Sequence, residues 1–163
     1  MQRVDVKRQA IRGVVENLAA DSWTALRVRD AMTANPVCVP RDRTALGIVE
    51  IFEEKRFQHL LVTDEGRLVG VLSDRDVVRL FGSHDSDERN YLETITAGEL
   101  MSLQPRTIGP DAPLLEAVQL MLEHGLHCLP VVEQGYARGI LTSTDLFLAL
   151  EQLLLHSASC PVG

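Results

Sequence analysis

Residues 70–76 (GVLSDRD) decide the fold, because their pattern returns in residues 139–145 (GILTSTD). Both stretches run from a glycine through two apolar residues, a hydroxyl residue and two variable residues to an aspartate. A hydroxyl residue three positions before an acid is typical of a helix N-terminus, where the acid reaches back to the first amide. Each stretch therefore predicts a bend from a strand into a capped helix, with Ser73 and Thr142 as the N-cap residues.

The chain around these bends is a tandem repeat with a constant offset of 69 residues, as from Met32 to Met101. Residues that are identical under this offset are Pro36/Pro105, Asp42/Asp111, Leu46/Leu115, Val49/Val118, Glu54/Glu123, Leu60/Leu129, Val62/Val131, Gly66/Gly135, Gly70/Gly139, Leu72/Leu141 and Asp76/Asp145. Self-similarity at a fixed period marks a repeated structural unit. We therefore expect two copies of one small unit, called copy one and copy two below.

Each copy reads as a β-α-β-β-α unit: an extended stretch, a helix with one apolar face, two strands joined by a tight turn, and a closing helix. In copy one these elements are expected at residues 36–39, 45–52, 60–63, 68–72 and 77–81. In copy two they are expected at residues 106–108, 114–122, 129–132, 137–141 and 146–154. The expected fold class is α/β (α+β), with the two tandem units packed pseudo-symmetrically and preceded by an N-terminal helix.

The divisions expected along the chain are an N-terminal helix and linker at 1–27, a first unit at 28–82, a polar connector at 83–96, a second unit at 97–156 and a tail at 157–163. The N-terminal segment carries an apolar stripe at helical spacing, formed by Val4, Ile11, Val14, Val15 and Leu18. Such a stripe predicts a helix that packs on the repeat or on a partner subunit. A helix lying on a membrane surface is the alternative.

Composition and net charge limit the classes of partner that the chain is expected to bind. The formal net charge of −7 and a pI near 5.2 oppose nucleic acid as a partner, because phosphate contacts need a basic surface. They oppose docking on anionic lipid as well. No apolar run is long enough to span a bilayer, and residues 1–15 lack the apolar core of a signal peptide. Cys38, Cys128 and Cys160 are too widely spaced to indicate a disulfide framework or a zinc motif, so we expect reduced thiols in a cytoplasmic protein.

The double bend, closing two units that each open with a methionine four residues before a proline, resembles the CBS domain family, whose paired units are called Bateman modules. The resemblance covers residues 28–150, and residues 72–76 look like those of small stand-alone bacterial members. It implies a regulatory binding module with no required cofactor. Its ligand would be AMP, ADP or ATP, with S-adenosylmethionine or NAD as alternatives, held in clefts between the copies. It implies a homodimer that signals to an effector protein.

The resemblance also assigns site residues, because in the family the motif aspartate holds ribose and the motif hydroxyl groups hold phosphate. The first cleft would gather Ser73, Arg75, Asp76 and His59 from copy one with Thr107, Ile108 and His127 from copy two. The second cleft would gather Thr142, Thr144, Asp145 and Cys128 from copy two with Val37, Cys38, Val39 and Gln58 from copy one. Cys128 departs from the family pattern, in which a basic residue stands at this position.

The two clefts should therefore differ in charge. The first has Arg75 and two histidines, whereas the second has no cation within the repeat. We expect the Asp76 cleft to bind the phosphorylated ligand, and the Asp145 cleft to bind weakly, to bind a neutral ligand or to stay empty.

The residues by themselves leave three function classes open: a ligand-sensing module, a structural homodimerisation scaffold with vacant clefts, and an enzyme. In the scaffold, the two aspartates would merely cap helices. The repeat and one helix use nearly all of the chain, so we expect neither a catalytic domain nor catalytic residues. His124, His127 and Cys128 lie close together but have no fourth ligand nearby, so we expect no metal. A nucleophilic pair of His59 with a cysteine lacks an orienting third group.

Overall fold

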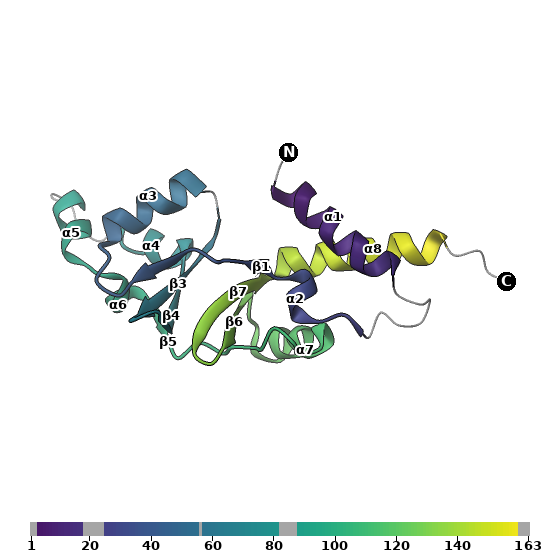
Figure 1. Cartoon of the computed structure of the whole chain (residues 1–163). Coiled ribbons are helices and arrows are strands. Elements are labelled where there is room, and N and C mark those ends of the chain that lie inside the picture. The colour runs from purple at the N-terminus through teal and green to yellow at the C-terminus, as the bar shows by residue number, and fades with distance from the viewer. Residues whose placement is uncertain (1–2, 18–24, 56, 82–87, 160–163) are drawn as a thin grey trace. The chain divides into compact units, whose positions relative to one another are not determined.

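The computed structural model describes residues 3–17, 25–55, 57–81 and 88–159 (Figure 1). The chain divides into two compact units, which we name after the aspartate that each contains. The Asp76 unit comprises Pro36–Arg106 and Gln134–Ala137. The Asp145 unit comprises Met1–Asn35, Thr107–Glu133 and Arg138–Gly163.

The Asp76 unit is built on a four-stranded run of sheet. Its strands are β2 (Cys38–Pro40), β3 (His59–Asp64), β4 (Arg67–Ser73) and β5 (Ser102–Leu103). Strand β3 is parallel to β2 and antiparallel to β4, and β4 is antiparallel to β5. Its helices are α3 (Ala45–Lys55), α4 (Asp74–Val78), α5 (Glu88–Thr94) and α6 (Ala97–Leu100). Leu60, Val62 and Leu72 are fully buried and form one core cluster with Ile48 of α3 and Val77 of α4.

The Asp145 unit repeats this plan. Its strands are β1 (Thr33–Ala34), β6 (Cys128–Glu133) and β7 (Tyr136–Thr142), the last of which begins in residues grouped with the Asp76 unit. Strand β7 pairs with β1 and with β6, and Ile108 bridges Val131 in the parallel sense. Its helices are α1 (Arg3–Glu16), α2 (Val28–Ala31), α7 (Leu114–His124) and α8 (Ser143–Ser159).

Each unit is completed by the opening segment of the other copy. Segment α2–β1 comes from copy one but lies in the Asp145 unit, where the Val28 amide donates to the Ala112 carbonyl at 3.0 Å. Segment α6–β5 comes from copy two but lies in the Asp76 unit, where the Ala97 amide donates to the Arg43 carbonyl at 2.7 Å. A sequence copy and a compact unit therefore do not contain the same residues, although each copy and each unit contains one bend.

This exchange explains the methionine and the glycine that the copies share. The side chain of Met101 lies against Gly70, and that of Met32 lies against Gly139, so closely that a Cβ at either glycine would overlap the thioether. Larger residues in such well-packed positions force side chains and backbone to shift. The glycine that begins each bend is thus required by packing against the opening segment of the other copy.

Both predicted hairpins are confirmed, and their turns have the backbone that a two-residue loop prefers. Glu65 and Gly66 have φ of 47° and 79°, and Gln134 and Gly135 have φ of 55° and 87°. Two consecutive residues with positive φ match the right-handed twist of the strands, as in a type I′ turn.

The structure differs from the expected elements at several places. The extended stretch expected at residues 106–108 forms no strand and contributes only the bridge between Ile108 and Val131. Helix α4 ends at Val78, and the turn continues through tighter bonds, with the Leu80 amide donating to the Val77 carbonyl at 2.9 Å. The segment expected to be a polar connector, residues 83–96, contains α5, which packs on α3 and buries Leu92. Helix α8 reaches Ser159, inside the predicted tail. Leu18 of the N-terminal stripe lies outside the described residues.

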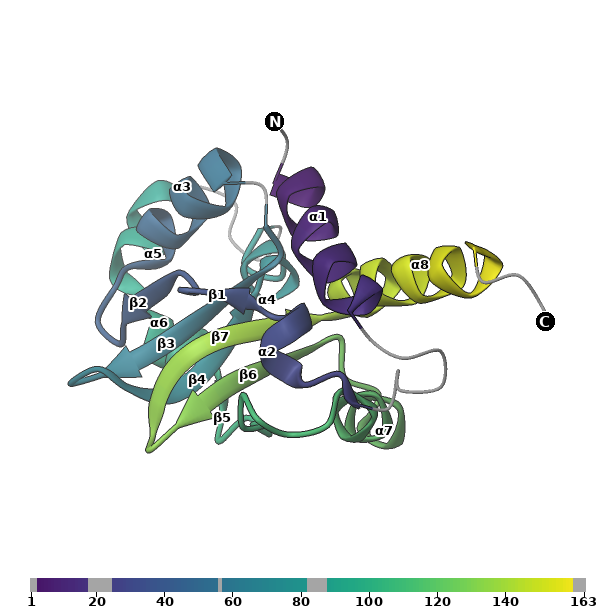
Figure 2. The same ribbon diagram turned by 45° about the vertical axis from the view of Figure 1, so that its right-hand side comes forward.

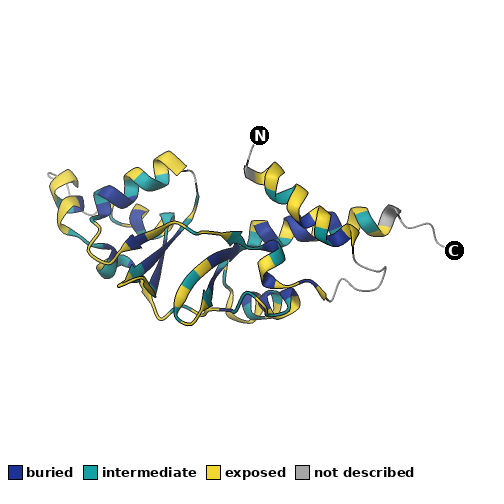
Figure 3. Cartoon of the chain, in the orientation of Figure 1, coloured by how far each residue is buried: buried dark blue, intermediate teal, exposed yellow. Residues whose placement is uncertain are grey.

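The predicted N-terminal helix is present as α1, and it packs against α8 (Figures 1 and 2). Ile11 and Val15 are each 1% exposed and belong to the core cluster of the Asp145 unit. Figure 3 shows the buried residues of α1 beside the buried residues of α8. Among the helices that the structure describes, none has the length and apolar character that crossing a bilayer requires.

Candidate functional site

The bend of the Asp76 unit has the hydrogen bonds of a capped helix start. The amide of Ser73 donates to Asp76 Oδ2 at 2.8 Å, and the Ser73 hydroxyl donates to the same oxygen at 2.7 Å. The other carboxylate oxygen, Oδ1, lies 3.8 Å from Arg79 Nη1, and the Asp76 side chain is 23% exposed. The structure therefore confirms the capping role and leaves one oxygen of the carboxylate facing an exposed cation and solvent.

Other predicted site residues of copy one lie at the same edge of the sheet. His59 pairs with Ser73 in the β3–β4 register, and the Gln58 carbonyl accepts from the Asp74 amide at 3.0 Å. Strand β2 runs parallel to β3 with Cys38 opposite Leu61, which places Val37 and Val39 close to this edge, with Val39 buried and Val37 exposed. Arg75 is exposed on α4. The copy-one residues predicted for the first cleft and those predicted for the second thus lie in the same compact unit.

Copy two has an equivalent bend in the Asp145 unit. The Thr142 amide and hydroxyl donate to Asp145 Oδ2 at 2.7 and 2.9 Å. The His127 carbonyl accepts from the Ser143 amide at 3.1 Å, as Gln58 does from Asp74. Ile108 bridges Val131 beside β6, and Thr107 precedes it, while Thr144 is exposed on α8. The bends match in their hydrogen bonds, so the difference between them lies in what reaches Oδ1.

Lys7 of α1 reaches Asp145. Its Nζ forms an ion pair with Asp145 Oδ1 and donates to the Thr33 hydroxyl at 2.8 Å. The Lys7 and Asp145 side chains are only 15% and 6% exposed. Sequence reasoning found no cation for this site because Lys7 lies outside the repeat. A signal was present, since Lys7 stands four residues before Ile11 and hence on the buried face of α1.

Arg79 is the second residue that the sequence analysis did not name. It follows α4 directly, three residues after Asp76, and its side chain is 81% exposed. Together with Arg75 it places two guanidinium groups next to the Asp76 bend. Guanidinium groups suit phosphate because their donors match its oxygens in pairs.

Cys128 stands at the position where the family resemblance expects a base. Burial raises the pKa of its thiol to about 11, and burial raises the pKa of Cys38 as well. Both thiols are free. A thiol with a raised pKa stays neutral at physiological pH, so Cys128 supplies neither a cation for phosphate nor a ready nucleophile.

Within the part of the chain that the structure describes, no three histidine, cysteine, aspartate or glutamate side chains come together as a metal ion would require. The sharing of each site between copies stays a prediction: Thr107, Ile108 and His127 with Asp76, and Val37, Cys38, Val39 and Gln58 with Asp145.

Comparison with known proteins identifies a family whose model matches this chain. The family model described as CBS domain matches residues 28–83 and 97–152. The solved structure of AcuB from Vibrio cholerae is 29% identical, with a TM-score of 0.70 over 83% of this chain and 98% of that one. The structure of CBSX2 in complex with AMP is 30% identical, with a TM-score of 0.67 over 78% of this chain and 98% of that one.

A curated relative shows how such a segment occurs within a larger protein. The A-adding tRNA nucleotidyltransferase of Aquifex aeolicus is 24% identical over 149 residues, which is 91% of this chain. The chain spans only 17% of that enzyme's length.

Proposed function

Because the chain belongs to the CBS domain family, we propose that it is a non-catalytic regulatory module that binds an adenine nucleotide or a related adenosyl ligand at the Asp76 bend. Ligand binding would change the conformation of the module and signal to a partner. We propose a cytoplasmic homodimer that acts on an effector protein and requires no cofactor.

The acceptor capacity of Asp76 carries this proposal. An ionised carboxylate offers about four lone-pair sites on its two oxygens. Ser73 uses two of them, both on Oδ2. Oδ1 is left to accept hydroxyl groups, and the Ser73 contacts hold the carboxylate in one orientation. A pair of ribose hydroxyls is a suitable ligand for a carboxylate held at the end of a strand in this way.

The charges near Asp76 support a phosphorylated ligand. Arg75 and Arg79 are both exposed, and Arg79 lies within 3.8 Å of Asp76 Oδ1. A ligand that joins a ribose to a phosphate would occupy the carboxylate and a guanidinium at once. The likeness to CBSX2, which was crystallised with AMP, supports AMP as the first ligand to test. ADP, ATP, S-adenosylmethionine and NAD follow as further candidates.

Isothermal titration of AMP into the whole protein tests the proposal. Asp76→Ala should weaken AMP binding by at least tenfold, because hydrogen bonds to a charged group contribute about 1.5–3 kcal/mol each. The matched control is Glu99→Ala. Glu99 Oε2 accepts from the Thr96 amide at 2.8 Å and from the Thr96 hydroxyl at 2.7 Å, so it makes the same capping contacts at the start of a different helix, α6.

The control variant should bind AMP as the wild type does. Equal losses in Asp76→Ala and Glu99→Ala would mean that the carboxylate acts only through helix capping. If none of the candidate ligands binds the wild-type protein, the module is better explained as a homodimerisation scaffold whose aspartates cap helices.

A further inference from the structure

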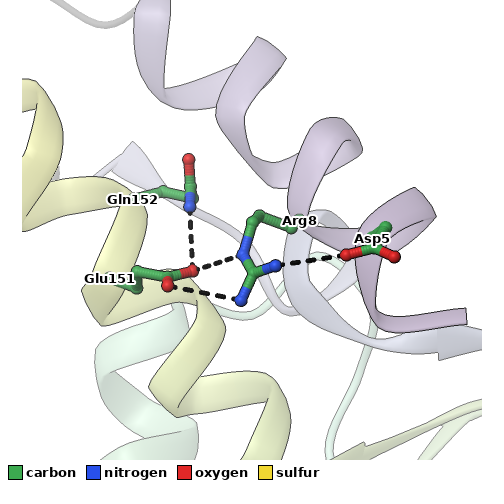
Figure 4. Close-up of polar contacts among 4 residues, drawn as sticks. All are labelled: Asp5, Arg8, Glu151 and Gln152. Atoms are coloured by element: carbon green, nitrogen blue, oxygen red, sulfur yellow. Dashed lines mark hydrogen bonds and ion pairs between the residues drawn. The ribbon is translucent and has the colours of Figure 1, made fainter. Parts of the chain in front are cut away.

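Helix α1 is attached to α8 by contacts of several kinds. Arg8 Nε donates to Glu151 Oε2 at 2.7 Å, and Arg8 Nη2 lies 3.3 Å from Glu151 Oε1, so the guanidinium spans both carboxylate oxygens (Figure 4). Asp5 and Gln152 flank this pair in the same view. One turn further along α1, Ile11 and Val15 enter the core. These contacts position Lys7 over the first turn of α8.

Lys7 occupies Oδ1 of Asp145, the oxygen that corresponds to the ligand-accepting Oδ1 proposed for Asp76. Asp145 Oδ2 already accepts from the Thr142 amide and hydroxyl, and Lys7 pairs with Oδ1. The carboxylate is 6% exposed, against 23% for Asp76. Both oxygens of Asp145 thus have partners from the chain itself, whereas Oδ1 of Asp76 faces an arginine that is 81% exposed.

We propose that α1 is an intramolecular competitor of the ligand at the Asp145 bend. Asp145 can accept a pair of ribose hydroxyls on Oδ1 only when Lys7 leaves it, and Lys7 leaves when α1 separates from α8. This inference rests on the proposed function and names its regulation. A nucleotide at Asp145 and a docked α1 exclude each other, so each weakens the other by the same factor.

The competition has a consequence for signalling. Release of α1 exposes Ile11 and Val15, which are 1% exposed when the helix is docked. A ligand at the Asp145 bend therefore changes the surface of the protein, while a ligand at the Asp76 bend leaves α1 in place. The apparent affinity for a ligand at Asp145 equals the intrinsic affinity multiplied by the fraction of molecules in which α1 is released.

AMP titration in an Asp76→Ala background isolates the Asp145 bend. Adding Lys7→Ala removes the competitor, and adding Arg8→Ala loosens α1 without touching Asp145. Both should tighten AMP binding, Lys7→Ala by about tenfold or more and Arg8→Ala, which removes an exposed pair, by about threefold, because each gain equals the factor by which the released fraction of α1 rises. Gly13→Ala should weaken binding, because Gly13 lies in α1 with open space around it and alanine favours the helix.

The matched control is Arg12→Ala. Arg12 lies on the exposed side of α1 and pairs with Glu16 of the same helix at 2.7 Å, so its loss should leave AMP binding unchanged. Hydrogen exchange of the α1 amides provides a second readout. Saturating AMP should speed exchange at Ile11 and Val15 in the Asp76→Ala protein.

The outcomes separate this inference from the proposed function. Weaker AMP binding in both Lys7→Ala and Arg8→Ala would overturn the competition and make Lys7 a phosphate contact. The absence of any gain in these variants, or unchanged exchange in α1 with AMP bound at Asp145, would overturn it too. If the wild-type protein bound AMP through Asp76 in such a case, the proposed function would stand. If the wild type bound none of the candidate adenosyl ligands, both would fall.

Discussion

Replacing Asp145 with alanine should destabilise the protein far more than replacing Asp76, although both residues cap a helix in the same way. Each carboxylate accepts an amide and a hydroxyl from its N-cap residue. Losing such a cap costs about 1 kcal/mol. Asp145 has a further partner, because its Oδ1 pairs with Lys7, and the two side chains are 6% and 15% exposed.

The expected difference follows from that buried pair. Removing one partner of a buried ion pair costs about 3–5 kcal/mol, mainly because the remaining charge is left without a partner. The lysine stem is flexible and lets the ammonium regain some water, so we expect the lower end of this range. Asp76→Ala should therefore cost about 1 kcal/mol for the lost cap, and Asp145→Ala about 4 kcal/mol, of which about 1 kcal/mol is the cap and about 3 kcal/mol the ion pair.

Urea unfolding followed by circular dichroism measures both losses. With a slope of about 2 kcal/mol per molar urea, Asp145→Ala should move the midpoint by about 2 M and Asp76→Ala by about 0.5 M. A second variant tests the cause. Lys7→Met in the Asp145→Ala protein should recover about 2 kcal/mol, because it replaces the buried ammonium that has lost its carboxylate with an apolar side chain. Equal losses in the two single variants, or no recovery in the double variant, would refute the buried pair.

Three further predictions concern packing, the pH dependence of stability and the reactivity of Cys128. Gly70→Ala should destabilise the protein by about 1–3 kcal/mol, because the new methyl group overlaps Met101, whereas Gly109→Ala, with nothing within 4 Å, should leave thermal stability unchanged or slightly raised. Burial raises the pKa of Cys128 to about 11, so the unfolded state deprotonates first and stability should fall as pH rises from about 9 towards 11. In the folded protein at pH 8, iodoacetamide should alkylate Cys128 about a hundredfold more slowly than an unperturbed cysteine, as peptide mass spectrometry can show. A Cys128 peptide alkylated as fast as free cysteine would contradict the buried, protonated thiol.

The elements and bends were predictable because their causes are local. Alternating and helical apolar patterns predict the strands and the longer helices. A capping box spans four residues, so Ser73 and Asp76 predict their own contact, and Thr142 and Asp145 do the same. The position of α5 was harder to predict, because a mostly polar segment becomes a helix here through the burial of Leu92 against α3.

Some backbone features were not predictable from residue types. Asn35 and Gln104 occupy equivalent positions in the repeat and have φ of 51° and 48°. Glutamine has no intrinsic preference for this left-handed region. The repeat predicts that the two positions, each followed by a proline, adopt the same backbone conformation. Only the folded chain shows that this conformation has a positive φ.

The capping partners of Asp76 and Asp145 could be predicted by residue number, whereas Lys7 as the ion-pair partner of Asp145 could not. The repeat can be read directly from the residue order. The turns and the capped bends can be predicted from it because they arise from contacts between near neighbours. The exchange of the α2–β1 and α6–β5 segments and the pairing of Lys7 with Asp145, 138 residues apart, arise from packing. Contacts of that kind depend on which apolar faces bury one another, and no local pattern specifies the partner.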